Sequence, residues 1–296
     1  MKLMDPKTRI SLKNILYLTD FSPVAEGAAP FVTALARHYG AKVFAVHVRG
    51  AEIYGMAPPE SWPVLVEAAQ ELAKEQAKDL GELFAGVEHE AIIEIGDVWD
   101  ATSALIEKNN IDLVVLGTHG RKGVEKVLLG SVAEKIFRLA PCPVLTVGPN
   151  VRLNANRTAE LKRILYATTF SPASVPAVAY AISMAQENQA HLDILHVVEA
   201  YKTGELVGPN ELKSGCEQRM HSLVPEGADL WCEPNFMVEV GEPAEQILAV
   251  AKGRQSDMIV LGLKSTSALG AATHLPWAIA HKIISHAECP VLTVRG

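Results

Sequence analysis

The feature that most constrains the fold of this chain is an internal repeat. Three segments of the first half return in the second half, in the same order. They are KNILYLTDFSP and KRILYATTFSP (residues 13–23 and 162–172), DLVVLG and DMIVLG (112–117 and 257–262), and PCPVLTV and ECPVLTV (141–147 and 288–294). Each half is therefore predicted to be one complete copy of the same structural unit.

A polar stretch joins the two copies. It reads GPNVRLNANRTAE at residues 148–160, and its content of Gly, Pro and Asn is typical of a linker. We therefore expect two domains, at residues 1–150 and 151–296. With 296 residues and 49% hydrophobic content, the chain is large enough for each domain to bury a core of its own.

Apolar runs alternate with segments of helical periodicity within each copy. In the first half the predicted strands lie at residues 15–20, 42–48, 89–96, 112–117 and 143–147, and the predicted helices at residues 23–39, 61–84, 98–110 and 131–139. In the first helix, Ser22 is the expected N-cap and Gly40 lies just past the end. Such a pattern predicts an α/β, doubly wound fold, in which a five-stranded parallel sheet has helices on both faces. The expected strand order is 3-2-1-4-5.

The last strand of each copy, VLTV at residues 144–147 and again at 291–294, would be an exposed apolar edge in an isolated domain. We expect these two strands to pair, so that the halves form an intramolecular pseudo-dimer. A homodimer of whole chains is a further expectation, although no motif specifies it.

Composition argues against several classes of function. A formal net charge of -7 and a pI near 5.8 are unlike those of a general nucleic-acid binder. Residues 1–14 lack the apolar core of a secretory signal, and no stretch approaches the roughly 18 apolar residues of a membrane span. We therefore expect a soluble, cytoplasmic protein that binds neither nucleic acid nor membrane. The four cysteines form no CxxC pair, which argues against a zinc site and a disulfide framework.

One segment occupies the position of a phosphate-binding loop. GTHGRKGVEKVLLGS, at residues 117–131, begins where the fourth strand ends and finishes where the fourth helix begins. Ligands of such sheets bind outside the carboxyl ends of the strands, where the strand order reverses, and this places Asp20 beside Gly117. The glycines follow the pattern G-x2-G-x9-G-S, which differs from both the Walker loop and GxGxxG.

The glycines of this loop admit two interpretations. Gly117 and Gly120 would let the backbone approach a ligand, and Gly130 and Ser131 would begin a helix whose free N–H groups suit an anion. Glycines after strands, and Gly-Ser before a helix, are also ordinary turn and capping features. The chemistry of these residues alone leaves both interpretations open.

The second half keeps the framework but differs at the candidate ligand positions. By position, the counterparts of Asp20, Gly120, Gly130 and Ser131 are Thr169, Ser265, Trp277 and Ala278. If the fold itself required these glycines, both halves should have them. The difference favours a ligand site in the first half alone.

At these residues the chain resembles the universal stress protein family, in its tandem form with two domains in one chain. The most specific element is G-x2-G-x9-G-[ST], which Gly117, Gly120, Gly130 and Ser131 fit without a gap. LTDFS at the first strand and APCPVLTV at the last strand add support, and the resemblance covers nearly the whole chain. It implies that the first domain belongs to the ATP-binding branch.

ATP, which Mg²⁺ could accompany, is the ligand that the resemblance implies. It assigns the nucleoside to Leu18, Thr19, Asp20, Val48, Leu116 and Gly117, and the triphosphate to His119, Gly120, Gly130, Ser131 and Val132. It assigns no catalytic residue and no metal ligand. In the second half Gly262 alone survives from this set, and Trp277 would intrude on the phosphate position, so that half is expected to be degenerate.

Three functions are compatible with these features. The leading one is an ATP-binding regulator of stress adaptation, in which nucleotide occupancy changes the affinity for a regulatory protein partner. The alternative is a slow ATPase or self-phosphorylating enzyme with Ser131 or Thr118 as the acceptor, because phosphoryl transfer mainly needs positioning and charge stabilisation. A scaffold that binds no nucleotide is the third, and it applies most strongly to the second domain.

Other polar residues have structural interpretations. His47 and His196 occupy matching places near the ends of the second strands, where we expect a structural role rather than catalysis. Asp97 precedes a predicted helix and Asp112 begins a predicted strand, positions at which capping by a carboxylate is ordinary.

Overall fold

The structure is a computed structural model that describes residues 9–50, 62–118, 129–153, 159–199, 209–225, 233–263 and 274–296. The strands of the first half are β1 (Asn14–Leu18), β2 (Lys42–Arg49), β3 (His89–Ile95), β4 (Leu113–Gly117) and β5 (Val144–Val147). Those of the second half are β6 (Arg163–Thr168), β7 (His191–Val198), β8 (Asn235–Val240), β9 (Met258–Leu263) and β10 (Val291–Arg295). The strands predicted for the first half are confirmed to within about two residues at each end.

Helices connect the strands in both halves. In the first half they are α1 (Pro23–Glu26), α2 (Ala29–Tyr39), α4 (Trp62–Leu83), α5 (Val98–Lys108) and α6 (Ser131–Leu139). In the second half they are α7 (Val175–Asn188), α8 (Pro209–His221), α9 (Pro243–Arg254) and α10 (His274–His286). Within the part of the chain that the structure describes, no helix is both long and apolar enough to cross a membrane.

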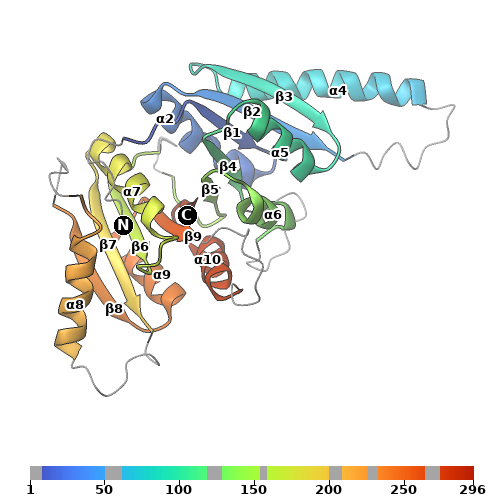
Figure 1. The fold of residues 1–296 in the computed structure, drawn as a ribbon. Coiled ribbons are helices and arrows are strands. Elements are labelled where there is room, and N and C mark those ends of the chain that lie inside the picture. The colour runs from blue at the N-terminus through green and yellow to red at the C-terminus, as the bar shows by residue number, and fades with distance from the viewer. Residues whose placement is uncertain are drawn as a thin grey trace.

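The strands form one ten-stranded sheet in the order β3-β2-β1-β4-β5-β10-β9-β6-β7-β8. Every neighbouring pair is parallel except β5 and β10, which are antiparallel. Each half therefore has the predicted order 3-2-1-4-5, with its last strand at the centre of the whole sheet. Figure 1 shows the first half in blue to green on one side of this pair, and the second half in yellow to red on the other.

The predicted pairing of the two last strands is confirmed. Val291 lies opposite Thr146, and Thr293 lies opposite Val144. The hydroxyl of Thr146 donates to the carbonyl of Val291, and the hydroxyl of Thr293 donates to the carbonyl of Val144, both at 3.1 Å. All four residues are buried, so the junction is part of a continuous core rather than a surface contact.

Helices cover both faces of the sheet, as predicted for a doubly wound fold. In β1, Ile15 and Tyr17 pack into a core cluster that includes residues of α2 and α7, whereas Leu16 and Leu18 pack into one that includes residues of α6, α9 and α10. Successive side chains of a strand point to opposite faces, and here both faces are buried. This double burial explains why the strands read as continuous apolar runs.

The first predicted helix is two helices in the structure. Its ends are as expected, because the Ser22 hydroxyl accepts the N–H of Ala25 at 3.3 Å and Gly40 ends α2 in the left-handed region at φ 64°. Between these ends, Ala28 occupies the N-cap position of a second helix, α2. Pro30 lies in the first turn of α2 and has no N–H, so it cannot donate the hydrogen bond that would continue a helix from α1. The prediction of one unbroken helix is therefore wrong.

Gly117 in β4 and Gly262 in β9 occupy matching positions near the ends of their strands. At each of them, the backbone that follows the neighbouring strand, β1 or β6, approaches the glycine closely. A Cβ atom on Gly117 would lie 2.9 Å from the Cα and N atoms of Ala25, and one on Gly262 would lie 2.4 Å from the Cα of Ser174. No Cβ fits at such distances, so the packing requires glycine at both positions. Gly117 thus has a packing role, whereas the loop pattern predicts a ligand role for it.

We expect Gly117→Ala and Gly262→Ala to lower the free energy of unfolding by about 1–3 kcal/mol, because overpacking forces the two segments apart. The loss should be larger at Gly262, where the approach is closer. Gly253→Ala, at an exposed helical position where a Cβ meets nothing within 4 Å, is the matched control. It should be neutral or stabilise by up to about 1 kcal/mol. Urea unfolding measures all three, and equal midpoints would contradict the packing role.

Candidate functional site

The candidate site lies at the carboxyl ends of the neighbouring strands β1, β2 and β4. Here 'this edge' means the side of the sheet that these strand ends form. The register pairs Leu18 of β1 with Val46 of β2 and with Leu116 of β4. Beyond β4, the N–H of Gly130 donates to the carbonyl of Thr118 at 2.8 Å, which places the start of α6 at the same edge. The following predicted residues therefore lie at the carboxyl ends of these strands or at the start of α6: Leu18, Thr19, Asp20, Val48, Leu116, Gly117, Gly130, Ser131 and Val132.

The floor of this edge is closed and largely apolar. Leu18, Thr19 and Leu116 are only 6%, 8% and 3% exposed, and the two leucines pack into the core beneath the edge. These residues offer a ligand a shaped surface rather than a charged group. His119 and Gly120, which belong to the same predicted set, fall outside the described residues.

Side chains of the segment TDFSP turn the chain sharply at the end of β1. The Thr19 hydroxyl accepts the N–H of Phe21 at 2.9 Å, and the Asp20 carboxylate accepts the N–H of Ser22 at 3.0 Å. These bonds accompany a left-handed backbone at Phe21, with φ 59°, which is uncommon for a bulky side chain. The Asp20 carboxylate is therefore held at the edge in a defined orientation.

The second half makes the same turn without a carboxylate. The Thr168 hydroxyl accepts the N–H of Phe170 at 3.1 Å, and Phe170 has φ 57°. Thr169 stands in the place of Asp20, and its hydroxyl is hydrogen bonded to that of Ser171 at 2.9 Å. The turn can therefore form without an aspartate, and the Asp20 carboxylate is a feature specific to the first half.

His47 and His196 support this turn in their respective halves. Their Nδ1 atoms each lie 2.8 Å from a backbone carbonyl oxygen, that of Thr19 for His47 and that of Thr168 for His196. Each ring also packs against the phenylalanine of the turn, with ring centroids 4.8 Å and 4.3 Å apart. The predicted structural role of these two histidines is confirmed.

The two aspartates with predicted structural roles also have them. Asp97 caps α5 and accepts the N–H of Trp99 at 2.8 Å. Asp112 accepts the N–H groups of Lys13 at 2.7 Å and of Asn14 at 3.0 Å, and so ties the start of β1 to that of β4. Across the described ranges, no three His, Cys, Asp or Glu side chains gather into a set that could hold a metal ion.

The first turn of α6 has features that suit an anion. Gly130 is its N-cap residue, with φ -62° and ψ 146°, and as a glycine it has no side chain with which to accept from the N–H groups of the first turn. Ser131 and Val132, the first two helical residues, are exposed. N–H groups at a helix start lack partners within the helix, and the positive end of the helix dipole lies there. A Cβ on Gly130 would lie 3.1 Å from the carbonyl oxygen of Thr118, so this position is tight.

Thr118 has a structural role at the candidate site that the glycine pattern of residues 117–131 does not predict. It is 1% exposed, its N–H donates to the carbonyl of Val147 at 3.0 Å, and its carbonyl accepts from Gly130. Thr118 thereby ties the ends of β4 and β5 to the start of α6. Its position directly after an apolar strand is the signal that could have indicated this role.

Trp277 does not occupy the position in its helix that Gly130 occupies in α6. α10 begins three residues before Trp277, which therefore lies inside the helix, whereas Gly130 lies outside α6 as its cap. The ring of Trp277 lies 5.2 Å from that of Phe137, and the guanidinium groups of Arg138 and Arg295 lie 5.9 Å and 5.5 Å from its centroid. These contacts give Trp277 a packing role at the junction between the halves.

Known proteins resemble this chain over both halves. A family model described as the Universal stress protein family matches residues 11–148 and 160–295. A universal stress protein of Methanocaldococcus jannaschii is 34% identical over 139 residues, which are 46% of this chain and 81% of that protein. The crystal structure of a universal stress protein from Archaeoglobus fulgidus covers 95% of this chain and 98% of its own, with a TM-score of 0.68 at 20% identity, a likeness in fold.

A universal stress protein has also been solved in complex with cAMP. It covers 45% of this chain and 97% of its own, at 16% identity and a TM-score of 0.37. A likeness of this degree carries no argument about the ligand of this chain.

A pH dependence follows from the burial of His196. Burial lowers its pKa, the hydrogen bond to Thr168 opposes this, and the charge of Arg219 adds to it. Between the ordinary value of 6.5 and the lowered value, the unfolded chain binds more protons than the folded chain. The contribution of His196 to stability is therefore complete above pH 6.5 and is lost as the pH falls through this window.

We expect the free energy of unfolding to fall less in His196→Asn than in the parent chain when the pH is lowered from about 7.5 to about 5.5. The asparagine amide can still donate a hydrogen bond to the carbonyl of Thr168. Urea unfolding at the two pH values measures the loss. The substitution His191→Asn, at an exposed position of the same strand, is the control. An equal loss in His196→Asn and in the parent chain would rule out a lowered pKa in the folded state.

Proposed function

This chain belongs to the universal stress protein family, in its tandem form, and we propose that it is a nucleotide-responsive regulator of stress adaptation that binds one ATP in its first half. The observation that carries the proposal is the glycine-capped first turn of α6 beside the ends of β1 and β4. A helix start with free N–H groups suits a phosphate, and sheets of this type bind ligands where the strand order reverses. Both features meet at this edge.

We assign the triphosphate to the start of α6 and to the loop before it. The N–H groups of Ser131 and Val132 would donate to phosphate oxygens, and the Ser131 hydroxyl would add a third donor. Gly130 would let the backbone lie against the anion. His119 and Gly120 complete the set that the family pattern suggests, and Mg²⁺ could accompany the phosphates and screen their charge.

We assign the nucleoside to the closed floor formed by Leu18, Thr19 and Leu116. Its apolar surface would lie under the base, with backbone of Val48 and Gly117 beside it. The oriented carboxylate of Asp20 would accept a hydrogen bond from an amino or hydroxyl group of the nucleoside.

Regulation would follow from a difference in the affinity for ATP between two conformational states of the chain. ATP can favour one state only to the extent that it binds that state more tightly than the other. A protein partner that recognises the ATP-bound state would then be recruited or released as the nucleotide level changes.

Slow phosphoryl transfer to the protein itself is the alternative, and the exposure of Ser131 is the observation that favours it. Thr118, the other predicted acceptor, is 1% exposed and lies between hydrogen-bonded backbone groups. A hydroxyl buried in this way is not accessible to a phosphate in this structure. Ser131 is therefore the acceptor that this alternative requires.

We expect one ATP per chain. In the second half Thr169 replaces Asp20, and Ala278, the counterpart of Ser131, lies inside α10 rather than at its start. Isothermal titration of the ligand-free chain with ATP should give a stoichiometry near one, and titrations with ADP and AMP would show which phosphates contribute. A stoichiometry near two would refute the restriction to the first half.

Gly130→Val should abolish ATP binding and cost the fold about 1–3 kcal/mol, because the position is tight. A Cβ there already lies 3.1 Å from the carbonyl oxygen of Thr118, and the added methyl groups would hinder the N–H groups of Ser131 and Val132. Ser131→Ala should weaken ATP binding by about 1–2 kcal/mol, because one hydrogen bond to a charged group is lost. Calorimetric titration measures both affinities.

Gly253→Val is the matched control for this pair, since a Cβ on Gly253 meets nothing within 4 Å and the residue lies in α9 of the second half. Its ATP affinity should equal that of the parent chain. Thermal melts of the ligand-free proteins separate a loss of binding from a loss of folding. Unchanged ATP affinity in a folded Gly130→Val protein would overturn the proposed site.

A further inference from the structure

The two halves differ at a pair of positions near the amino ends of their strands. The segments from α5 to β4 and from α9 to β9 align without a gap, and Ile106 and Ile111 of the first half correspond to Ala251 and Ser256 of the second. Ile106 and Ile111 are each 5% exposed and help to fill the core. The second half has smaller side chains at both positions, so less of the space there is filled.

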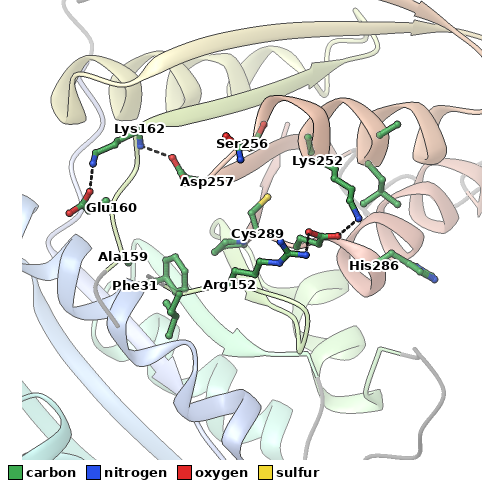
Figure 2. Close-up of a pocket in the computed structure, with 17 residues that line it drawn as sticks. Phe31, Arg152, Ala159, Glu160, Lys162, Lys252, Ser256, Asp257, His286 and Cys289 are labelled. Carbon is green, nitrogen blue, oxygen red and sulfur yellow. Dashed lines mark hydrogen bonds and ion pairs between the residues drawn. The ribbon is translucent and has the colours of Figure 1, made fainter. Parts of the chain in front are cut away.

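A cavity of about 720 Å³ opens at this place in the second half (Figure 2). Ala251, Ser256 and Cys289 line it from the second half, Phe31 lines it from α2 of the first half, and Arg152 lines it from the segment between the halves. Its volume is in the range of known small-molecule pockets. None of the predicted nucleotide residues that the structure describes lies in its lining.

Ser256 contributes a buried polar group to the lining of the cavity. The Ser256 hydroxyl is buried without a hydrogen bond to any described residue, and Ser256 is 9% exposed. Burying a hydroxyl without a partner is unfavourable, and the first half avoids this with the isoleucine at Ile111. A ligand in the cavity would satisfy the group once rotation about the Cα–Cβ bond of Ser256 turns the hydroxyl toward the cavity.

Most charged side chains that line the cavity are paired with one another, and the Asp257 carboxylate accepts the backbone N–H groups of Lys162 and Arg163, both at 2.9 Å. Glu288 forms ion pairs with Arg152 at 2.9 Å and with Lys252 at 2.7 Å, and Glu160 pairs with Lys162 at 2.5 Å. Figure 2 shows the Lys252 and Lys162 pairs as dashed lines. An ionic ligand would have to break such pairs and supply its own compensation. The rim therefore favours an uncharged ligand.

The walls favour an aromatic body. Phe31 offers an aromatic ring, and Leu153 and Ala251 offer aliphatic surface. Burial raises the pKa of the Cys289 thiol to about 12, so this wall is uncharged at neutral pH. We propose that the cavity binds a small uncharged molecule with an aromatic body and one hydroxyl or carbonyl group that hydrogen bonds to Ser256.

Three naphthalene probes of similar size test this proposal on the full chain. We expect 2-naphthol to bind more tightly than naphthalene, which cannot make the hydrogen bond, and more tightly than 2-naphthoate, which is charged. Titration monitored by probe fluorescence gives the three dissociation constants. Tighter binding of 2-naphthoate than of 2-naphthol, or no binding of 2-naphthol, would overturn the proposal.

Two substitutions at Ser256 distinguish the contribution of the hydrogen bond from that of the cavity volume. Ser256→Ala keeps the cavity and should weaken 2-naphthol binding roughly three- to tenfold, while naphthalene binding stays the same. Ser256→Ile introduces the residue that the first half has at Ile111 and should abolish the binding of both probes. Equal 2-naphthol affinity in the parent chain and in folded Ser256→Ile protein would refute the proposed location.

Ala251→Ile introduces the residue that the first half has at the matching position, Ile106, and also fills the cavity. It should likewise abolish the binding of 2-naphthol and naphthalene. It keeps the test decisive if Ser256→Ile does not fold, and thermal melting establishes which variants fold. ATP affinity should be unchanged in both isoleucine variants. A result that refutes the proposed cavity ligand can therefore be distinguished from one that refutes the proposed nucleotide site.

Discussion

The antiparallel pairing of β5 with β10 is the interaction on which the rest of the structure depends. Each of these strands would be an exposed edge in a separate half, and their pairing covers both edges at once. The pairing also joins the cores, because one buried cluster contains Val147 of β5 and Val294 of β10 together with residues of α2 and α7. The halves share a core, so separating them would expose apolar surface on each.

Because the same unit occurs twice, each half is a reference for the other. Features present in both serve the framework, as when Asp112 and Asp257 each accept two backbone N–H groups and tie two strands together. Features present in one half alone indicate where function has diverged. Asp20 at the candidate site is such a feature of the first half, and Ser256 in the cavity is one of the second.

Most of the fold could be predicted from the sequence, since strands buried on both faces read as unbroken apolar runs and a repeated apolar edge can be covered by its own copy. The place of the candidate site followed from the strand order. The packing role of Gly117 could not be predicted, because it depends on a contact with Ala25 that motif spacing does not contain. The position of Trp277 was misjudged because α10 has 13 residues and α6 only 9. The cavity at Ser256 needs side chains from both halves, which no single motif records.

Since β5 and β10 run in opposite directions, the carboxyl edge of the first half and the amino edge of the second form one rim of the sheet. Gly148, which follows β5, lies between them, and a Cβ there would be 3.7 Å from the Thr118 hydroxyl and 3.5 Å from the carbonyl oxygen of Ile284 in α10. The proposed nucleotide site and the cavity therefore lie along the same rim. Ligands bound at the two proposed sites would then be presented on the same side of the sheet.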